Sequence, residues 1–160
     1  MKAIMLSVNP PHAGNLVDGL KRVEWRIKPF PVPCIAFIYE TKRNGGCGKV
    51  IGEVVFEKSR RFDTNKISFS DLGTIVFGMV FIADLKRYAE KNKGILYANK
   101  SENAKRYDKP KELSEFARFQ EKHCKERDCT NCNKHYVPIG YCEKVKIHRP
   151  PQSWCYVEAK

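Results

Sequence analysis

Four cysteines lie close together near the C-terminal end of the chain, with the spacing C-x4-C-x2-C-x9-C. They are Cys124, Cys129, Cys132 and Cys142, and His135 lies among them. Two thiolates separated by two residues can bind one metal ion from a single turn, and two flanking ligands then complete a tetrahedral zinc shell. The residues between the cysteines are almost all polar, so this segment has too little apolar material to fold on its own core. The pattern predicts a structural zinc site within residues 123–142.

Other states of these cysteines remain compatible with the spacing. His135 can replace Cys142 as the fourth zinc ligand. The C-x4-C-x2-C spacing also matches plant-type iron–sulfur loops, although the charged sequence KERD at 125–128 is poorly suited to a sheltered cluster. The cysteines can also remain free thiols. Because a closed tetrahedral shell has no open coordination position, none of these states makes the cysteine segment the first choice for an active site.

A second group of chemically interesting residues lies in the sequence GLKRVEWR, residues 19–26. If residues 23–27 form a strand, Glu24 and Arg26 point to the same face of it. An ion pair between them would ordinarily stabilise the fold. If the pair faces a cleft, Glu24 would instead hold Arg26 oriented toward an anionic ligand.

The length and composition of the whole chain limit these possibilities. A length of 160 residues fits one domain with its own core. The sequence has no apolar run long enough to span a membrane and no pattern typical of a signal peptide. Seven cysteines, four of them clustered, favour reduced thiols and a metal over disulfides. We therefore expect a cytoplasmic protein with a single domain over residues 1–160, in which 123–142 is a cysteine-rich insertion.

The charge balance points to an anionic partner. The chain has 30 lysines and arginines against 18 acidic residues, a formal net charge of +12. The segment Lys86–Lys111 is especially basic and contains Tyr88, Tyr97 and Tyr107. Basic surface interspersed with aromatic side chains suits a phosphate backbone and stacked bases. A solvated lysine-rich face would have the same composition.

Strands and short helices must position these residues. Apolar and alternating runs predict strands at residues 3–8, 23–27, 34–40, 49–57, 95–100 and 153–158. Helices are predicted after Pro10 and Pro11, within 82–93, and over 111–122, where Leu113, Phe116 and Phe119 have helical spacing. This order predicts an α+β fold, a small open β-barrel with two to three flanking helices.

The sequence also resembles the ASCH family, whose domain is related to the PUA fold. The resemblance is carried, in order along the chain, by LSVNP at 6–10, the G-x-K-x-x-E-x-R pattern at 19–26, IYET at 38–41, GEV at 52–54 and RPPQSWCY at 149–156. The resemblance implies that shorter family members pass directly from the preceding segment to RPPQSWCY, so we interpret the cysteine segment as an insertion.

The resemblance implies a PUA-like barrel with a cleft that binds RNA or a nucleotide-like ligand. RNA is preferred over DNA because of the relationship to PUA domains. The residues expected at or near this cleft are Lys21, Arg22, Glu24, Arg26, Ser7, Asn9 and Tyr39. Trp25, Tyr39 and Trp154 are further candidates for stacking on a base, although each is also a typical core residue.

The family resemblance also implies an enzymatic alternative that uses the same cleft. Some relatives resemble amidohydrolases that act on N4-acetylcytidine through a lysine, a threonine and a glutamate. Lys21 matches the lysine, Glu24 stands at the threonine position, and Glu53 or Glu57 are candidates for the glutamate. Other relatives resemble ribonucleases, for which Lys21 could act with Ser7 or Ser153. Lys21 and Glu24 are therefore the candidate catalytic residues, and a hydroxyl or carboxylate within hydrogen-bond reach of Lys21 would favour this alternative.

A third class of function is an interaction adaptor in transcription. Such a protein would be expected to carry an exposed apolar patch rather than a basic cleft.

Overall fold

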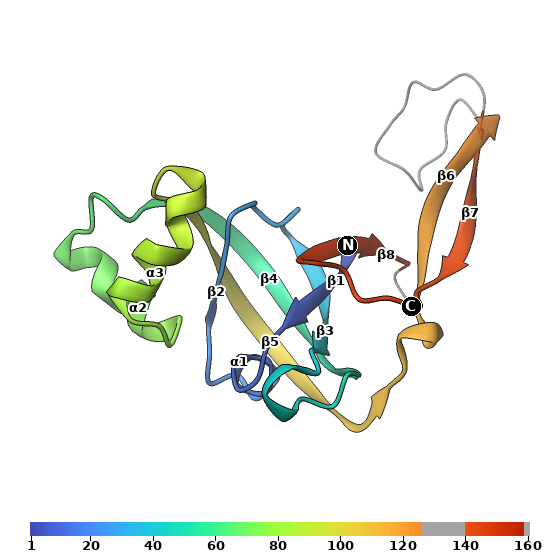
Figure 1. Cartoon of the computed structure of the whole chain (residues 1–160), viewed down its shortest axis with the longest axis horizontal. Coiled ribbons are helices and arrows are strands. Elements are labelled where there is room, and N and C mark those ends of the chain that lie inside the picture. Colours follow the sequence, from blue (N-terminus) through green and yellow to red (C-terminus); the bar gives the residue numbers. More distant parts are fainter. Residues whose placement is uncertain (126–139, 159–160) are drawn as a thin grey trace.

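The computed structural model describes the backbone of residues 1–125 and 140–158, and the side chains of 1–118 and 145–158. Its centre is a six-stranded sheet with the strand order β2-β5-β4-β3-β1-β8 (Figure 1). The strands are β1 (Lys2–Val8), β2 (Val23–Arg26), β3 (Cys34–Glu40), β4 (Val50–Asp63), β5 (Ile95–Lys111) and β8 (Trp154–Val157). β1 and β3 are parallel, and every other neighbouring pair in this sheet is antiparallel.

Short helices surround the sheet. They are α1 (His12–Val17), α2 (Leu72–Phe77) and α3 (Ile82–Ala89), with single 3-10 turns η1 (Arg43–Gly45), η2 (Phe69–Asp71), η3 (Glu90–Asn92) and η4 (Leu113–Glu115). Figure 1 shows α2 and α3 at one end of the molecule and the hairpin of β6 (Ala117–Lys125) and β7 (Gly140–Lys146) at the other. In the described part of the chain, no helix is long and apolar enough to cross a membrane.

The central strands are apolar on both faces because each face covers a different part of the core. Ile4 and Leu6 of β1 pack with Ile38 of β3 in one cluster, which also holds α1. Met5 of β1 and Phe37 of β3 point to the opposite face and pack in a second cluster. Alternate side chains of a strand point to opposite faces, so a strand buried on both sides has a nearly continuous apolar run. A third cluster lies between α2, α3 and the strands β2, β4 and β5.

The predicted α+β class is confirmed, whereas the expected barrel is not closed. β2 and β8 remain the two edges of the sheet, with no ladder between them in the described residues. The two long strands also differ from the prediction, in their length. β4 continues to Asp63, beyond its predicted end at residue 57, and β5 continues to Lys111, beyond its predicted end at residue 100. The short β2 pairs along β5.

The helix predicted over residues 111–122 is wrong. Leu113 and Phe116 are buried in the second cluster, as their spacing suggests, but the 3-10 turn η4 is enough to place both of them. Phe116 packs against Phe37 with ring centroids 5.0 Å apart. The chain then continues as β6, which pairs with β7. A strand whose partner lies beyond a long connection is not visible to a local pattern of apolar residues.

The cysteine segment is flanked by this hairpin. Cys124 is in β6 and Cys142 is in β7, where Glu121 pairs with Cys142 and Cys124 with Gly140. Cys129, Cys132 and His135 lie outside the described residues. Among the side chains that the structure describes, no group of three histidine, cysteine or acidic residues could hold a metal ion. The predicted zinc site therefore remains a prediction.

Candidate ligand-binding cleft

The backbone of the 19–26 segment is held in place by hydrogen bonds from side chains of β5. Ser101 donates a hydrogen bond from its hydroxyl to the Lys21 carbonyl at 3.3 Å. The buried Asn99 amide donates to the Glu24 carbonyl at 3.0 Å and accepts from the Phe30 amide at 3.3 Å. β5 thus fixes the path of the chain on both sides of Val23. Glu24 is thereby presented from the edge strand β2, and Lys21 from the turn before it.

Lys21, Glu24 and Arg26 form a buried ion-pair cluster. Lys21 Nζ lies 2.5 Å from Glu24 Oε2, and Arg26 Nη2 lies 2.7 Å from Glu24 Oε1. Arg26 Nε also donates to Glu24 Oε1 at 2.9 Å. Both carboxylate oxygens of Glu24 are therefore bound by cations. The predicted pairing of Glu24 with Arg26 is present, and Lys21 joins it from the preceding turn.

The electrostatics of this cluster favour a charged Glu24. Burial alone would raise the pKa of Glu24, but the adjacent Lys21 and Arg26 outweigh it and hold that pKa below its usual value. Two cations against one carboxylate leave a net charge of about +1 in a place with little solvent. Uncompensated buried charge is costly, so this site is suited to an anionic or strongly electronegative ligand.

Arg26 also connects this cluster to the C-terminal segment. Its Nη2 donates to the Ser7 carbonyl of β1 at 2.8 Å, and its Nη1 donates to Ser153 Oγ at 3.3 Å. The Ser7 hydroxyl in turn donates to the Pro151 carbonyl at 2.7 Å. β2 and β1 share no backbone ladder in the described residues, and these side-chain hydrogen bonds connect them instead. The sequence RPPQSW at 149–154 is brought next to GLKRVEWR by these contacts.

A cleft of about 600 Å³ opens over the cluster. Its walls come from the end of β1, α1, β2, the 41–43 turn, the α3 region and residues 150–152. The lining side chains are Ser7, Val8, Asn9, His12, Lys21, Glu24, Trp25, Arg26, Thr41, Arg43, Val80, Asp84, Leu85, Tyr88, Pro150, Pro151 and Gln152. This volume is in the range of sites for small molecules or for one or two nucleotides.

Most of the residues that the family resemblance placed at the cleft are in it. Lys21, Glu24, Arg26, Ser7 and Asn9 all line it, and Asn9 accepts a hydrogen bond from Thr41 at 2.6 Å.

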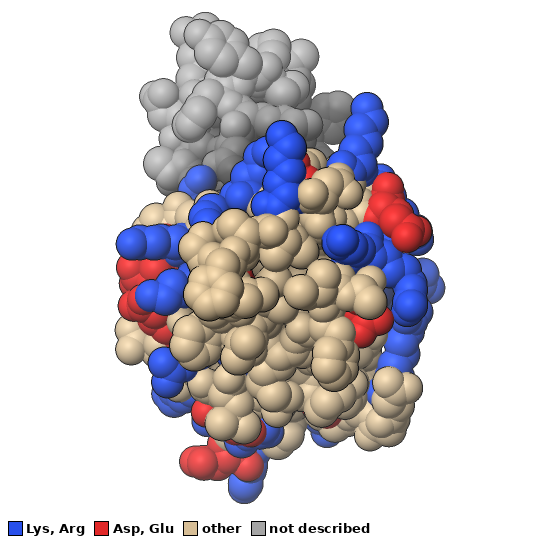
Figure 2. All heavy atoms as spheres, turned by 90° about the vertical axis from the view of Figure 1, so that its left-hand side faces the viewer, with Lys and Arg blue, Asp and Glu red and all other residues tan. Residues whose placement is uncertain are grey.

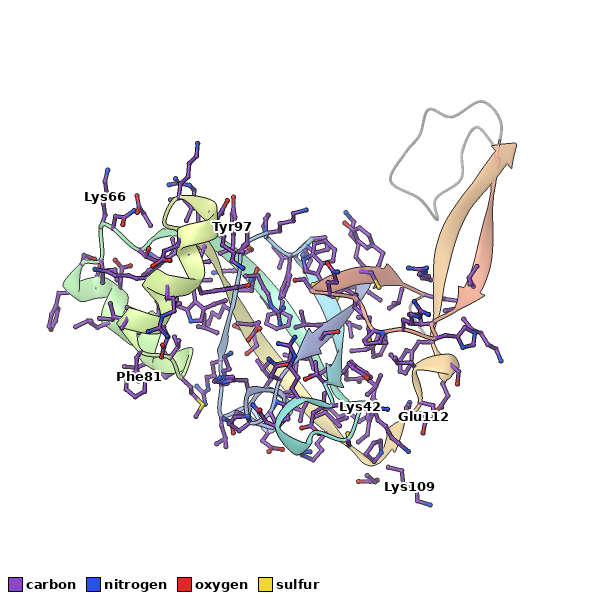
Figure 3. The ribbon with its side chains drawn as sticks, viewed as in Figure 1. Lys42, Lys66, Phe81, Tyr97, Lys109 and Glu112 are labelled. Carbon is purple, nitrogen blue, oxygen red and sulfur yellow. The ribbon has the colours of Figure 1, made fainter. Side chains whose placement is uncertain are left out.

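Two expected residues lie elsewhere. Arg22 is exposed, and its guanidinium lies 6.0 Å from the centroid of the Phe77 ring. Tyr39 is buried in the second cluster and lines a separate hollow of about 560 Å³ on the side of the molecule where Lys42 and Glu112 lie (Figure 3).

Some of the aromatic candidates line the cleft and others do not. Trp25 lines the cleft while its ring packs edge-on against Phe62, with centroids 4.8 Å apart. Trp154 packs with Phe30 and Tyr156 and is not among the lining residues. Of the tyrosines in the basic segment, Tyr88 lies at the cleft. Of these two cleft aromatics, Tyr88 is exposed and remains a stacking candidate, whereas Trp25 is a buried core residue.

His12 is a cleft residue that the sequence did not indicate. Its Nδ1 is buried and has no hydrogen-bond partner in the described part of the structure. Partial burial and, to a smaller degree, the charge of Lys21 lower the pKa of His12, so its imidazole is neutral at neutral pH. A single histidine after two prolines has no distinguishing pattern. Only the fold, which places α1 over the ion-pair cluster, brings it to the site.

The contacts of Lys21 bear on the enzymatic alternative. The Glu24 carboxylate lies within hydrogen-bond reach of Lys21, at 2.5 Å. The candidate serines are engaged differently, since Ser7 donates to Pro151 and Ser153 accepts from Arg26. Glu53 accepts a hydrogen bond from Tyr107 at 2.7 Å, Glu57 is exposed, and neither is among the residues that line the cleft.

Comparisons with known proteins identify the fold. No protein-family model matches the sequence, and no curated protein matches it. Solved structures do match. The crystal structure of ASCH from Zymomonas mobilis has a TM-score of 0.62 at 19% identity, and the match covers 98% of this chain and 88% of that one. A serine-to-alanine and a tyrosine-to-phenylalanine mutant of the same protein each give a TM-score of 0.64 at 19% identity. The chain has the fold of these ASCH proteins.

Proposed function

We propose that this chain is an ASCH-like module that binds RNA or a nucleotide-like ligand in the cleft over Lys21, Glu24 and Arg26. The observation that carries the proposal is the buried cluster with two cations and one carboxylate on the floor of an open cleft. A phosphate or an electronegative base edge would compensate the remaining positive charge. The likeness to ASCH structures supports the same interpretation at the level of the fold.

Lys21 is the group best placed to donate to such a ligand. All three nitrogens of the Arg26 guanidinium have acceptors within the protein. Lys21 Nζ carries three donors, and Glu24 uses one of them among the described contacts. Glu24 and Arg26 therefore position the lysine, and Lys21 has donors left for the ligand.

The rest of the cleft suits a nucleotide in other ways. Tyr88 presents exposed aromatic surface in the lining, and Arg43 adds a further cation. Stacking on an aromatic ring contributes about 1–3 kcal/mol per base. His12 and Asn9 can exchange hydrogen bonds with a base edge, which is how single-stranded RNA is usually recognised.

Fluorescence anisotropy with a labelled single-stranded RNA tests this proposal. A random sequence of about 20 nucleotides exceeds the site size of a small single-strand-binding domain, about 4–16 nucleotides. Lys21→Met keeps most of the buried volume and removes the charge. We expect it to weaken binding about tenfold to hundredfold, the range for one hydrogen bond to a charged group. The matched control is Lys100→Met, because Lys100 is exposed on β5 and pairs with Glu102.

Salt dependence gives the second readout. Binding of the native protein should weaken steadily as salt concentration rises, and Lys21→Met should show a smaller slope. Thermal unfolding of both variants checks that they are folded. Binding that is equal in native protein and Lys21→Met, or lost to the same degree in Lys100→Met, would contradict the proposal.

A second candidate function is hydrolysis in the same cleft, favoured by the 2.5 Å contact between Lys21 and Glu24. The substrates to assay are N4-acetylcytidine and single-stranded RNA. Turnover that is abolished by Lys21→Met and by Glu24→Gln would establish it. Glu24 is paired with two cations and held ionised, so it is a weak base, and this is why we place binding first.

We also propose that the cysteine segment binds one structural zinc ion. The spacing of Cys124, Cys129, Cys132 and Cys142 supports this, as does the hairpin that pairs the strands carrying the first and last of them. Zinc thiolates require reduced cysteines, which fits the expectation of a cytoplasmic protein.

Elemental analysis of protein purified without chelators tests the zinc proposal. We expect about one zinc per chain, and a loss of it in Cys129→Ser. The control is Cys47→Ser, since Cys47 is exposed in the turn before β4. Comparing Cys142→Ser with His135→Ala identifies the fourth ligand. Protein without metal, or zinc retained in Cys129→Ser, would contradict the proposal.

A further inference from the structure

The face formed by η2, α2 and the start of α3 exposes many large apolar side chains. We call it the α2–α3 face and define it by Phe69, Leu72, Val76, Phe77, Met79, Phe81 and Ile82, all of which are exposed. Three of them are almost entirely in solvent, Phe69 at 90%, Phe81 at 79% and Val76 at 70% exposure. Figure 2 shows this end of the molecule as a broad uncharged area, and in Figure 3 Phe81 points away from the body of the protein. Contiguous apolar surface of this kind usually marks an interaction site.

The helix α2 is apolar on both of its sides. Ile75 points inward and packs in the third core cluster with Phe62 and Leu96. Leu72 and Val76 are four residues apart, so they form a separate stripe that is exposed. A surface helix normally pairs an apolar inner side with a polar outer side. The outer side of α2 therefore has the composition of a surface that is covered by something else.

The exposed side chains are carried by well-anchored backbone. Ser68 and Asp71 form a reciprocal capping box at the start of η2, and Arg60 of β4 binds Asp71 at 2.8 Å. Gly78, after α2, lies so close to the Trp25 ring that a methyl group there would overlap it. These contacts hold the face in one arrangement, so a partner would meet a preformed surface.

Basic side chains border the α2–α3 face. Arg22 lies beside Phe77, and Arg60 is next to η2. Lys66 lies at the same end of the molecule (Figure 3), and Figure 2 shows lysine and arginine side chains, together with some acidic ones, around the uncharged area. Asp71 pairs with Arg60 and Asp84 with Arg87, so these pairs add no net charge. Arg22 and Lys66 are the named cations that supply the positive charge of the border. The surface is thus apolar at its centre and positive at its border.

We propose that the α2–α3 face docks an acidic amphipathic helix of a partner protein. Apolar side chains at helical spacing would cover Phe69, Val76 and Phe81, and acidic residues beside them would meet the basic border. A second copy of this chain would instead bring two positive borders together. Helices that lie in membranes are usually long continuous amphipathic segments, whereas α2 has 6 residues and α3 has 8.

The α2–α3 face is a separate site that borders the cleft. Val80, Asp84, Leu85 and Tyr88 belong to the same segment of chain and line one wall of the cleft. A partner bound to the α2–α3 face would therefore lie beside the ligand proposed there. RNA binding in the cleft and helix docking on the face can be tested with different variants.

Selection from a displayed library of helical peptides tests the proposal without assuming a particular sequence. The bait is the full chain, and the counter-selection bait is the chain with Phe69→Ser, Val76→Ser and Phe81→Ser. These residues are so exposed that their loss should leave the fold intact. We expect enriched peptides with large apolar residues at i, i+3, i+4 and i+7 and an excess of aspartate and glutamate. Their affinity should fall at least tenfold in the triple variant and stay unchanged in Tyr156→Ser, an exposed aromatic on β8.

The other possible occupants give different outcomes. Concentration-dependent dimerisation that the triple variant abolishes would overturn the proposal in favour of self-association. Binding to phosphatidylserine vesicles without peptide enrichment would overturn it in favour of a membrane surface. Loss of RNA binding in the triple variant would make the face part of an RNA site. Absence of enriched peptides, or enrichment of basic ones, would also refute it.

Discussion

The cleft and the α2–α3 face are adjacent but built in opposite ways. In the cleft, charged groups are buried and are bound to one another, with Glu24 held by Lys21 and Arg26. On the face, apolar groups are exposed and make few contacts, as Phe69 and Phe81 show. Buried charged groups and exposed large apolar groups are both unfavourable in an isolated protein. Each arrangement is what a binding surface requires, for an anion in one case and for an apolar partner in the other.

The two regions also differ in how the chain assembles them. The cleft gathers residues from both ends of the sequence, since Arg26 contacts Ser7 and Ser153. The face comes from a single continuous segment, residues 69–82. Contacts between distant residues must be held by the whole fold, so changes in the cleft should cost more stability than changes on the face.

The largest effect should follow the loss of Glu24. Glu24→Ala removes the one carboxylate between two buried cations and should lower the free energy of unfolding by about 3–5 kcal/mol. Glu24→Gln retains an acceptor and should cost less. Chemical denaturation measures both, with Glu102→Ala as the control because its pair with Lys100 is exposed. A loss no greater than in that control would show that the cluster is not structurally important.

A smaller effect is expected where the two regions meet. A methyl group at Gly78 would overlap the Trp25 ring, so Gly78→Ala should destabilise the protein by about 1–3 kcal/mol. The matched change is Gly73→Ala in α2, where the added methyl meets open space and should stabilise by about 0.4–1 kcal/mol. Opposite signs of the two changes in thermal unfolding would confirm the packing. Equal effects would mean that α2 does not lie against Trp25 as described.

The smallest effect concerns the pH dependence of stability at the edge of the α2–α3 face. Asp71, at the edge of the face, accepts hydrogen bonds from the Ser68 backbone and hydroxyl and from Arg60, which lower its pKa to about 2. Because the folded pKa is below the ordinary value of 3.8, the stability from this group is present above about pH 3.8 and is lost as the pH falls toward 2. NMR titration of the carboxyl carbon should report this pKa, and Ser68→Ala should raise it. An ordinary pKa in the native protein would contradict the capping box.

Local patterns predicted much of the fold. The six strands of the central sheet and the helix after Pro11 are present, and the helix predicted within 82–93 is present as α3, which ends at Ala89 and is followed by the 3-10 turn η3. The extra length of β4 and β5 was missed because charged residues, such as Arg60 and Arg61, can continue a strand when a partner strand pairs with it. The error at 111–122 has the same cause, since pairing with β7 overrides the helical spacing.

The candidate site was predictable only in part. The G-x-K-x-x-E-x-R pattern indicated Lys21, Glu24 and Arg26, and the structure brings their side chains together. Arg22 was included because it is adjacent in sequence, but neighbouring residues of an extended chain point to opposite sides, and it contacts Phe77 instead. His12 carries no local signal, because its position depends on how α1 packs against the central strands.

The central claim is that the ligand binds over Lys21, Glu24 and Arg26. Titration of isotope-labelled protein with single-stranded RNA, followed by amide and side-chain NMR shifts, tests it most directly. We predict saturable shifts at His12, Lys21, Glu24, Arg26 and the 150–152 segment, and no comparable shifts at Phe69 or Val76. Shifts confined to the α2–α3 face, or no saturable shifts in the cleft, would contradict the account.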